Sequence, residues 1–477
     1  MSLSGKLPTT SYQYNSLMNK AIDSSARSAQ YMPINGSSFS NATNNLIRIE
    51  LRASASEFWD SKNSYLKFKV TFNATNSGIL DGSAASFFSR VRVLCGSTVI
   101  SDLNSFGVVM NNLIANGGSD DLYRTMSITS GVDSRANIEY DYNIGASKGG
   151  AVFESTGVTT RTFSIPLIGG VFASPRLIPL CMMAPVTIEL TMTPTFSDVW
   201  KRVFTDNASG TAYTGTLTHS ISGVALVSRM VTINDQNALQ QIKDMMIAQD
   251  GLRIKTTDYT CIYNTVQAQA GNQYFPIATR SKSLKSIISM MVNTNSTTTI
   301  SNIQTYPNNI GGDSTVANVE GGYSYKVGSV QYPNQDVAVA YNNLTESYSE
   351  YLRCFASGLW NLNAHSFSDY YSWYPTYTAT PYAGRVDTAN ANIASGNGTV
   401  GNAITTGISY GSFAMAYNFE AYNFDELFSG IDTETTAIPV SLKINFAQAP
   451  ASCTLISLCI SDQVLIVKPD GNVLVDL

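Results

Sequence analysis

Charged residues are scarce in this sequence of 477 residues. Asp, Glu, Lys and Arg together make up 13% of the chain, and the formal net charge is −5. A typical soluble domain has about a quarter charged residues, so much of this surface is expected to contact other protein instead of bulk water. A small negative charge gives no general reason to bind nucleic acid, and no sequence-specific nucleic-acid binding is predicted.

Long apolar runs are also missing. No stretch approaches the roughly 20 apolar residues that a membrane-spanning helix needs. No apolar stretch follows Met1–Lys6, as it would in a secretory signal. The six cysteines are scattered and form no Cys-x-x-Cys motif. They are predicted to be buried free thiols in a reducing compartment, and the sequence leaves one disulfide open.

Side chains that bind metals are sparse. His219 and His365 are the only histidines, and neither has a cysteine or a second histidine at zinc-ligand spacing. Both are expected to lie in loops and to face solvent or an interface. Five carboxylates of the second half lack the spacing of a calcium-binding loop: Asp387, Asp425, Glu426, Asp432 and Glu434. No cofactor or metal is predicted.

Three further patterns resemble active-site motifs, but the secondary structure predicted around them does not fit those motifs. Gly407–Gly411 matches G-x-S-x-G around Ser409, but a strand pattern follows where that motif needs a helix. Gly396–Gly401 matches G-x-G-x-x-G, but neither a strand nor a helix flanks it. Glu420 and Asp425 are predicted to lie on a solvated face and in a turn, not to form a glycosidase pair. The protein is therefore not expected to be an enzyme.

A strand pattern that occurs twice is the strongest positive signal. Pro185–Met192 and Pro439–Phe446 both alternate apolar and polar residues, and each follows a loop with glycine, at Gly169–Gly170 and at Gly430. Such a strand buries one face and exposes the other, as in an antiparallel sandwich. The chain is long enough for two full cores. The sequence therefore predicts an all-β protein with two β-sandwiches in tandem.

Composition and strand patterns divide the chain into four parts. These are a flexible N-terminal arm (1–45), a first sandwich (46–234), a helical connector (235–251) and a second sandwich (252–477). The arm is rich in Ser, Asn and Thr. The connector has Asp235 as N-cap and apolar residues at helical spacing. Strict alternation predicts two sets of core residues: Leu66, Phe68, Val70 and Phe72 in the first sandwich, and Val440, Leu442, Ile444 and Phe446 in the second.

Two elements of the second half have predicted ends. Tyr323–Pro333 is expected to be one strand, with a bulge at Gly328 and its end at Pro333. Apolar residues at helical spacing predict a helix from about Leu344, capped by Asn342 or Asn343 and stopped at Gly358.

Aromatic residues gather in one long loop between these strands. They are Trp360, Tyr370, Tyr371, Trp373, Tyr374, Tyr377 and Tyr382. Such a segment can form a platform that stacks on sugars or bases, or it can anchor a protein–protein interface. Only Arg385 adds positive charge nearby, which argues against nucleic acid. A subunit interface is the preferred interpretation.

The N-terminal arm carries apolar residues at intervals. They are Leu7, Tyr12, Tyr14, Leu17, Met18 and Ile22. The segment lacks the apolar density to fold alone but has enough anchors to dock on a partner. It is therefore predicted to dock on a neighbouring protein molecule.

Three stretches resemble the double jelly-roll major capsid proteins of double-stranded DNA viruses, of the polinton-like virus, virophage and nucleocytoplasmic large DNA virus type. They are Glu57–Val70, Arg176–Leu190 and Phe413–Phe446, the last with Phe419–Glu420 and Ser429–Thr433. The resemblance runs from about residue 46 to the C-terminus and rests on the order and spacing of strands. It implies two tandem eight-stranded jelly-roll β-sandwiches with short helices and long loops.

The same resemblance implies a function. A major capsid protein of this type forms homotrimers of pseudo-hexameric outline, which assemble with minor (penton-type) capsid proteins into an icosahedral shell around double-stranded DNA. Both jelly rolls would stand upright in the shell after assembly in the host cytoplasm or nucleus. The N-terminal arm would face inward and would tie neighbouring capsomers together or bind a minor capsid protein. The resemblance leaves an internal membrane open, and nothing in the sequence indicates one. A β-sandwich attachment or carbohydrate-binding protein remains the alternative.

Overall fold

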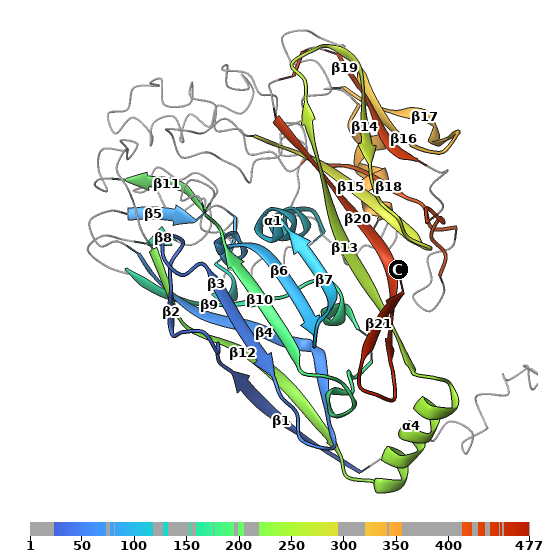
Figure 1. Ribbon diagram of the computed structural model, residues 1–477. Coiled ribbons are helices and arrows are strands. Elements are labelled where there is room, and N and C mark those ends of the chain that lie inside the picture. Colours follow the sequence, from blue (N-terminus) through green and yellow to red (C-terminus); the bar gives the residue numbers. More distant parts are fainter. Residues whose placement is uncertain are drawn as a thin grey trace, which may run out of the picture.

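The fold is seen in a computed structural model (Figure 1). The structure describes residues 23–72, 77–80, 82–117, 126, 128–131, 152–153, 159–174, 176–194, 199–204, 219–293, 320–340, 343–354, 413–421, 428–434, 439–447, 449–450 and 453–476.

Two antiparallel sheets form the first half of the molecule (Figure 1). Sheet A has the strand order β1 (Ser24–Tyr31), β12 (His219–Ile233), β4 (Glu57–Phe72) and β9 (Thr160–Pro166), and the short β2 (Ser38–Phe39) also pairs with β12. Sheet B has the order β3 (Leu46–Leu51), β10 (Val186–Met192), β6 (Phe88–Cys95) and β7 (Thr98–Asn104). A small third sheet has the order β11 (Trp200–Phe204), β5 (Ser77–Leu80) and β8 (Val152–Phe153).

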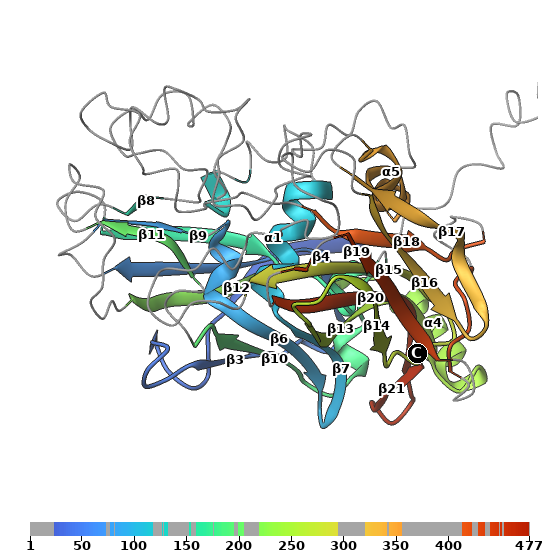
Figure 2. The same ribbon diagram turned by 90° about the horizontal axis from the view of Figure 1, so that it is seen from above.

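Two further sheets form the second half. Sheet F has the order β13 (Leu252–Val266), β20 (Cys453–Val467), β15 (Leu284–Asn293) and β18 (Met415–Asn418), and β21 (Val473–Asp476) also pairs with β20. Sheet G has the order β14 (Gly271–Ile277), β19 (Val440–Phe446), β16 (Gly321–Val327) and β17 (Val330–Val339). Seen from above, the two halves lie side by side (Figure 2).

The two halves have the same topology. Sheet A corresponds to sheet F strand by strand, and sheet B corresponds to sheet G, in the same order along the chain. The helices correspond as well, because α1 (Phe106–Gly117) lies between β7 and β9, and α5 (Thr345–Arg353) lies between β17 and β18. Each half is thus an eight-stranded antiparallel sandwich of one design. The predicted all-β fold of two tandem jelly rolls is confirmed.

Short helices complete the described part of the chain. The helix α4 (Gln236–Ala248) joins β12 to β13, and the side chain of Asp235 accepts hydrogen bonds from Asn237 N and Ala238 N, as expected for its N-cap. Three 3₁₀ helices lie in the first half: η2 (Ala84–Phe87), η3 (Val171–Ala173) and η4 (Leu180–Met182).

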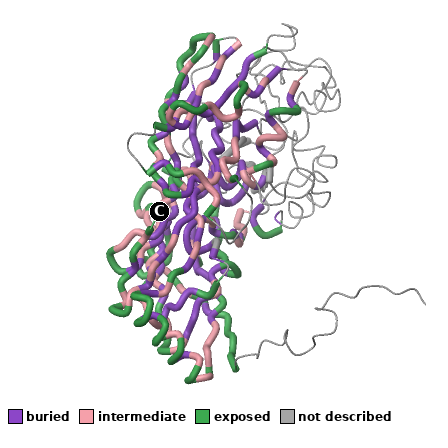
Figure 3. Tube along the Cα trace, turned by 90° about the vertical axis from the view of Figure 1, so that its right-hand side faces the viewer, coloured by how far each residue is buried: buried purple, intermediate pink, exposed green. Residues whose placement is uncertain are grey.

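Both predicted cores are buried as expected. Figure 3 shows buried segments running along the strands of both sandwiches. All eight predicted core side chains, from Leu66 to Phe72 and from Val440 to Phe446, are at most 3% exposed. Phe68 packs edge to face against Phe88, with ring centroids 5.1 Å apart. Lys67 and Lys69 point to the other side of the sheet and are exposed, as the alternation predicts.

The predicted arm is too long. Residues 24–39 belong to the first sandwich, because Ser24–Tyr31 forms β1 and pairs with β12 along its whole length. As an edge strand, β1 contributes little to the core, and Ala29 is its one buried side chain. Edge strands do not need the apolar alternation that identifies central strands, so composition alone assigned this segment to a flexible arm.

Two elements of the second half also differ from their predictions. Gly328 lies in the hairpin turn between β16 and β17, with a φ of 61°, and does not form a bulge within one strand. Pro333 lies inside β17 instead of ending it. β17 is the edge strand of sheet G, and the register with β16 shifts between Tyr323 and Tyr325, so an N–H is not needed at the proline. The helix α5 ends at Arg353, before the predicted stop, and its N-cap Leu344 makes no side-chain hydrogen bond.

The six cysteines are free thiols, and four of them are buried as predicted, whereas Cys181 and Cys354 are partly exposed. Burial raises the pKa of Cys95 to about 11 and the pKa of Cys261 and Cys459 to about 12. These thiols are therefore protonated at neutral pH, and their contribution is to core packing.

His219 does not face solvent. It begins β12, is 3% exposed, and packs against the ring of Phe87 with centroids 5.1 Å apart. The prediction of a loop histidine was wrong because the β12 pattern continues further toward the N-terminus than its apolar residues indicate. Burial lowers the pKa of His219 from its ordinary value of 6.5 to about 4.

This buried histidine predicts a pH dependence of stability. His219 takes up a proton below about pH 6.5 in the unfolded chain, but only near pH 4 in the folded chain. The stabilisation is therefore complete above pH 6.5, and the free energy of unfolding decreases by about 3 kcal/mol as the pH falls from 6.5 to 4. The variant His219→Gln should show a flatter melting temperature against pH over this range. His365→Gln, which removes the other histidine, should keep the slope of the native protein. Equal slopes for His219→Gln and the native protein would contradict the assignment.

Candidate functional site

Both predicted contact segments lie outside the described residues. This holds for the aromatic segment 360–382 and for all six apolar arm residues, from Leu7 to Ile22. The two glycine motifs at 396–401 and 407–411 and the residues Asp387, Asp425 and His365 also lie outside them. The described part of the chain offers instead two other features, the junction between the jelly rolls and a buried ionic cluster beside it.

Hydrogen bonds to backbone carbonyls hold the two jelly rolls together. The Nε2 of Gln463 on β20 donates to the carbonyl of Ile100 on β7 at 2.8 Å, and Gly170 N donates to the carbonyl of Thr257 on β13 at 2.8 Å. Ala184 N donates to the carbonyl of Gly471 at 2.9 Å. Each bond joins one jelly roll to the other, so directional contacts as well as apolar packing fix the orientation of the pair.

Gly170 packs closely against β7 of its own jelly roll. Its φ is 51°, and a Cβ at this position would lie 2.7 Å from the Cβ of Ser101. The neighbouring Gly169 also has a positive φ, of 94°. The glycine pair singled out in the sequence therefore serves a tight turn at the junction, where a larger residue does not fit.

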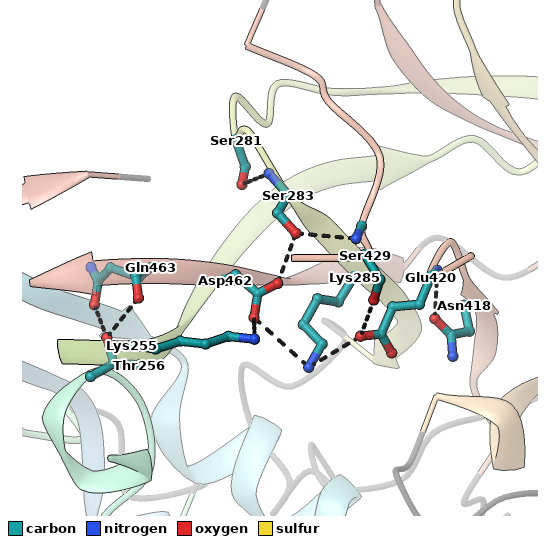
Figure 4. A network of polar contacts seen from close by, with 11 residues as sticks. Lys255, Thr256, Ser281, Ser283, Lys285, Asn418, Glu420, Ser429, Asp462 and Gln463 are labelled. Carbon is teal, nitrogen blue, oxygen red and sulfur yellow. Dashed lines mark hydrogen bonds and ion pairs between the residues drawn. The ribbon is translucent and has the colours of Figure 1, made fainter. Parts of the chain in front are cut away.

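A buried ionic cluster lies at the edge of this junction (Figure 4). The side chain of Asp462 on β20 is fully buried and lies 3.3 Å from Lys255 Nζ and 3.9 Å from Lys285 Nζ. Ser283 Oγ donates a hydrogen bond to its Oδ2 at 2.7 Å. A buried carboxylate is tolerated only when charge and hydrogen bonds compensate its lost hydration, and here both are present.

Glu420 extends the cluster. Lys285 Nζ lies 3.3 Å from Glu420 Oε1, and Ser429 Oγ donates to the same oxygen at 3.2 Å (Figure 4). The side chain of Glu420 is 6% exposed. The prediction that Glu420 lies on a solvated face was therefore wrong, since the alternating pattern of its strand did not reveal a lysine on the neighbouring strand.

The Ser429–Thr433 stretch is held against the start of β15. Gly430 N donates to Ser283 Oγ at 3.1 Å, and Thr433 N donates to the carbonyl of Ser281 at 2.8 Å. Ile431 forms a two-way backbone bridge with Leu284. This stretch is one of those on which the family resemblance rests, and its structural role is to close the second jelly roll over the ionic cluster.

Gly430→Ala tests this closure. An added Cβ would lie 2.5 Å from the carbonyl oxygen of Leu284 and 2.7 Å from Ser283 Oγ, so the segment must move away. We expect a loss of about 1–3 kcal/mol in the free energy of unfolding, measured by urea titration. Ala421→Ser adds one heavy atom at an exposed position and should change little. Equal stability of the two variants would contradict the close packing of Gly430.

The chemistry of the ionic cluster indicates a structural role. Its lysines and carboxylates compensate one another, and Lys255 also lies 4.9 Å from the ring centroid of Phe428. Among the described residues, no group of three or more His, Cys, Asp or Glu side chains is arranged to hold a metal ion. No helix in the described ranges is long and apolar enough to cross a membrane.

Sequence reasoning missed this cluster. A sequence signal existed, because Asp462 and Gln463 interrupt the apolar strand Cys453–Val467, and Lys255 and Lys285 lie near the starts of two other strands. Charged residues inside otherwise apolar strands indicate buried ion pairs, but which strands are neighbours is known only from the fold.

Comparisons with solved structures identify proteins of similar fold. The Faustovirus major capsid protein has a TM-score of 0.55 at 10% identity, over 95% of this chain and 92% of its own. The mavirus major capsid protein has a TM-score of 0.52 at 9% identity, over 100% of this chain and 96% of its own. A chain in the structure of the Sputnik virophage has a TM-score of 0.54 at 9% identity, over 100% and 93%. No protein-family model and no curated protein matches the sequence.

These matches show a shared fold. At about one identical residue in ten, they extend over nearly the full length of this chain and of each neighbour. The chain therefore has the double jelly-roll fold of these viral major capsid proteins, as the resemblance in its sequence implied.

Proposed function

We propose that this protein is a major capsid protein. It would self-assemble as homotrimers of pseudo-hexameric outline into an icosahedral virus shell that encloses double-stranded DNA. The observation that carries this proposal is the match to the Faustovirus and mavirus major capsid proteins over 92% or more of every chain involved. Function does not follow from fold alone, so the proposal also rests on the absence of catalytic motifs from the sequence.

The repeated topology supports the trimer in particular. Each chain presents two sandwiches of the same strand order. Three copies around a threefold axis would therefore present six similar units, which gives a nearly hexagonal outline that can tile a closed shell. A monomer with two different domains would not offer this outline.

The proposal assigns contacts and a location. The aromatic residues of segment 360–382 would be subunit contacts, since Tyr and Trp are enriched in interfaces. The partners would be further copies of the chain and minor (penton-type) capsid proteins, with no sequence-specific nucleic-acid binding and no enzymatic activity. The protein would reside in the virion after assembly in the host cytoplasm or nucleus.

Light scattering and electron microscopy of the purified protein test the proposal. A trimer mass at micromolar concentration, with hexagonal particles or closed shells in micrographs, is the expected result. Obligate interfaces bury roughly 2,000 Å² or more, so the trimer should persist on dilution. Discrete monomers under these conditions would contradict the proposal and favour an attachment protein.

The arm has its own test, with a boundary set by the structure. Deleting residues 2–22 retains β1 and is expected to leave folded trimers with nearly unchanged melting but impaired assembly into shells. Deleting residues 2–40 also removes β1 and β2, which pair with β12, and should lower the melting temperature. If the shorter deletion closes into shells as efficiently as the full-length protein, the arm is not a tie between capsomers.

A further inference from the structure

The outer face of sheet A is basic. Lys67 and Lys69 on β4 are two residues apart and point away from the core, so their side chains emerge roughly 7 Å from each other. Arg229 on β12 points to the same side, between the buried Ser228 and Met230. Tyr65 lies on this face as well and is 40% exposed. These four residues are here called the basic face.

Hydroxyl and other uncharged groups surround these cations. In the register of the sheet, Lys67 lies opposite Ser164 and Ala225, and Lys69 lies opposite Thr162 and Ser222. Among the described residues that lie opposite these cations in the sheet, Asp60 is the carboxylate: it lies opposite Arg229 and accepts a hydrogen bond from Asn63 at 2.7 Å. Within the described ranges, Lys67, Lys69 and Arg229 form no ion pair.

The other outer face of the same jelly roll is different. On sheet B, Arg48 Nε lies 2.8 Å from Glu189 Oε1, and Arg92 Nη1 lies 3.6 Å from Glu189 Oε2. Arg90 Nε donates to Asp102 Oδ1 at 2.6 Å. The cations of sheet B are thus compensated within the chain, so the uncompensated cations of sheet A are a local property and not a general feature of this fold.

The counterpart of the basic face in the second jelly roll differs as well. On sheet F, Ile288 lies opposite Leu458, and Met290 lies opposite Ile456. These four side chains are at most 4% exposed. Two sheets of the same topology therefore have different outer faces, one apolar and covered, the other basic and open.

We propose that the basic face binds a carboxylate-rich surface of a second copy of this chain. The inference rests on the proposed self-assembly and names the face and the chemistry that it uses. The chain carries 34 acidic and 29 basic residues, so another copy offers an excess of carboxylates. The exposed Tyr65 beside the lysines adds a side chain that is common in interfaces. Long-range attraction between such faces would orient the copies before they touch.

Charge and shape favour a protein partner over nucleic acid. Three cations on a flat sheet would neutralise only about three phosphates, and binding of that size is weak at physiological salt. Carboxylates on a second flat protein face can pair with each cation individually. A nucleic acid, by contrast, carries many more negative charges, which the net charge of −5 on this chain repels.

A charge-reversal pair tests the proposal. The variant Lys67→Glu/Lys69→Glu should raise the concentration for half-maximal self-association at least about tenfold, measured by sedimentation velocity. The control Arg176→Glu/Lys243→Glu changes the net charge equally at exposed positions on other elements and should associate like the native protein. Self-association of the native protein should also weaken as NaCl rises from about 50 to about 500 mM.

Zero-length cross-linking identifies the partner group. A carbodiimide joins lysine to carboxylate only when they touch, so an equal mixture of unlabelled and ¹⁵N-labelled chains should give mixed-label peptides that contain Lys67 or Lys69. The masses of the cross-linked peptides identify the carboxylate that pairs with each lysine.

Three outcomes would overturn the inference, and they are distinguishable. If all variants and the native protein stay monomeric, the proposed function fails together with the basic face. If both double variants assemble like the native protein and no mixed-label peptide contains these lysines, only the basic face fails. If the native protein instead binds DNA fragments through Lys67 and Lys69, shown by loss of binding in the double variant, the partner is a polyanion and the inference is wrong.

Discussion

Replacing Phe68 by alanine is expected to lower the free energy of unfolding by about 3–5 kcal/mol. The ring lies at the centre of an aromatic cluster, with centroids 5.1 Å from Phe88, 5.9 Å from Phe163 and 6.1 Å from Phe87. It is 0% exposed, so alanine leaves a cavity that three other rings cannot fill without losing their own contacts. Urea unfolding at a fixed protein concentration measures the loss, since association would otherwise shift the midpoint.

The exposed Lys62 of the same strand supplies the control. Lys62→Ala removes a long side chain at an exposed position outside the basic face, and the free energy of unfolding should change by at most about 0.5 kcal/mol. A loss for Phe68→Ala no larger than that of the control would mean that the aromatic cluster does not form the core of the first jelly roll.

The contrast between these two positions explains what the sequence could predict. Period-two alternation identifies a strand that has one solvent-facing and one buried face, and β4, β10 and β19 have this pattern. Their core residues follow directly from it. The recurrence of the pattern in each half also reflects a real repeat, because β10 and β19 hold the same place in sheets B and G.

The errors share one physical cause. The edge strands β1 and β17 satisfy only one side of their backbone, so polar side chains and even a proline are tolerated there. Apolar alternation therefore identifies central strands but does not identify edge strands. For the same reason the predicted arm extended into the first jelly roll.

Buried polar groups were beyond sequence reasoning for a second reason. Glu420 and Asp462 are separated by 42 positions but share Lys285, which comes from a third segment. Whether a carboxylate is solvated or buried depends on which strands lie beside it, and that depends on the order β20, β15, β18 in sheet F. Only the fold supplies that order.

Replacing Asp462 by asparagine is expected to lower the free energy of unfolding by roughly 3–5 kcal/mol. The substitution keeps the shape of the side chain but removes the charge of the carboxylate that lies beside both Lys255 and Lys285. The side chain of Asp462 is 0% exposed and those of the lysines are 23% and 19% exposed, so water can restore little of the lost compensation. Urea unfolding of the variant and the native protein measures the difference.

Asp476→Asn is the matched control for this variant. Asp476 also pairs with a lysine, Lys282, but its side chain is 46% exposed and that of Lys282 is 52% exposed. Solvent screens such a pair, and its loss should leave the unfolding midpoint nearly unchanged. The comparison separates the removal of a charge from the removal of a buried charge. If both variants unfold at the same urea concentration, the cluster around Asp462 is as solvated as the surface pair and does not stabilise the contact of β13, β15 and β20.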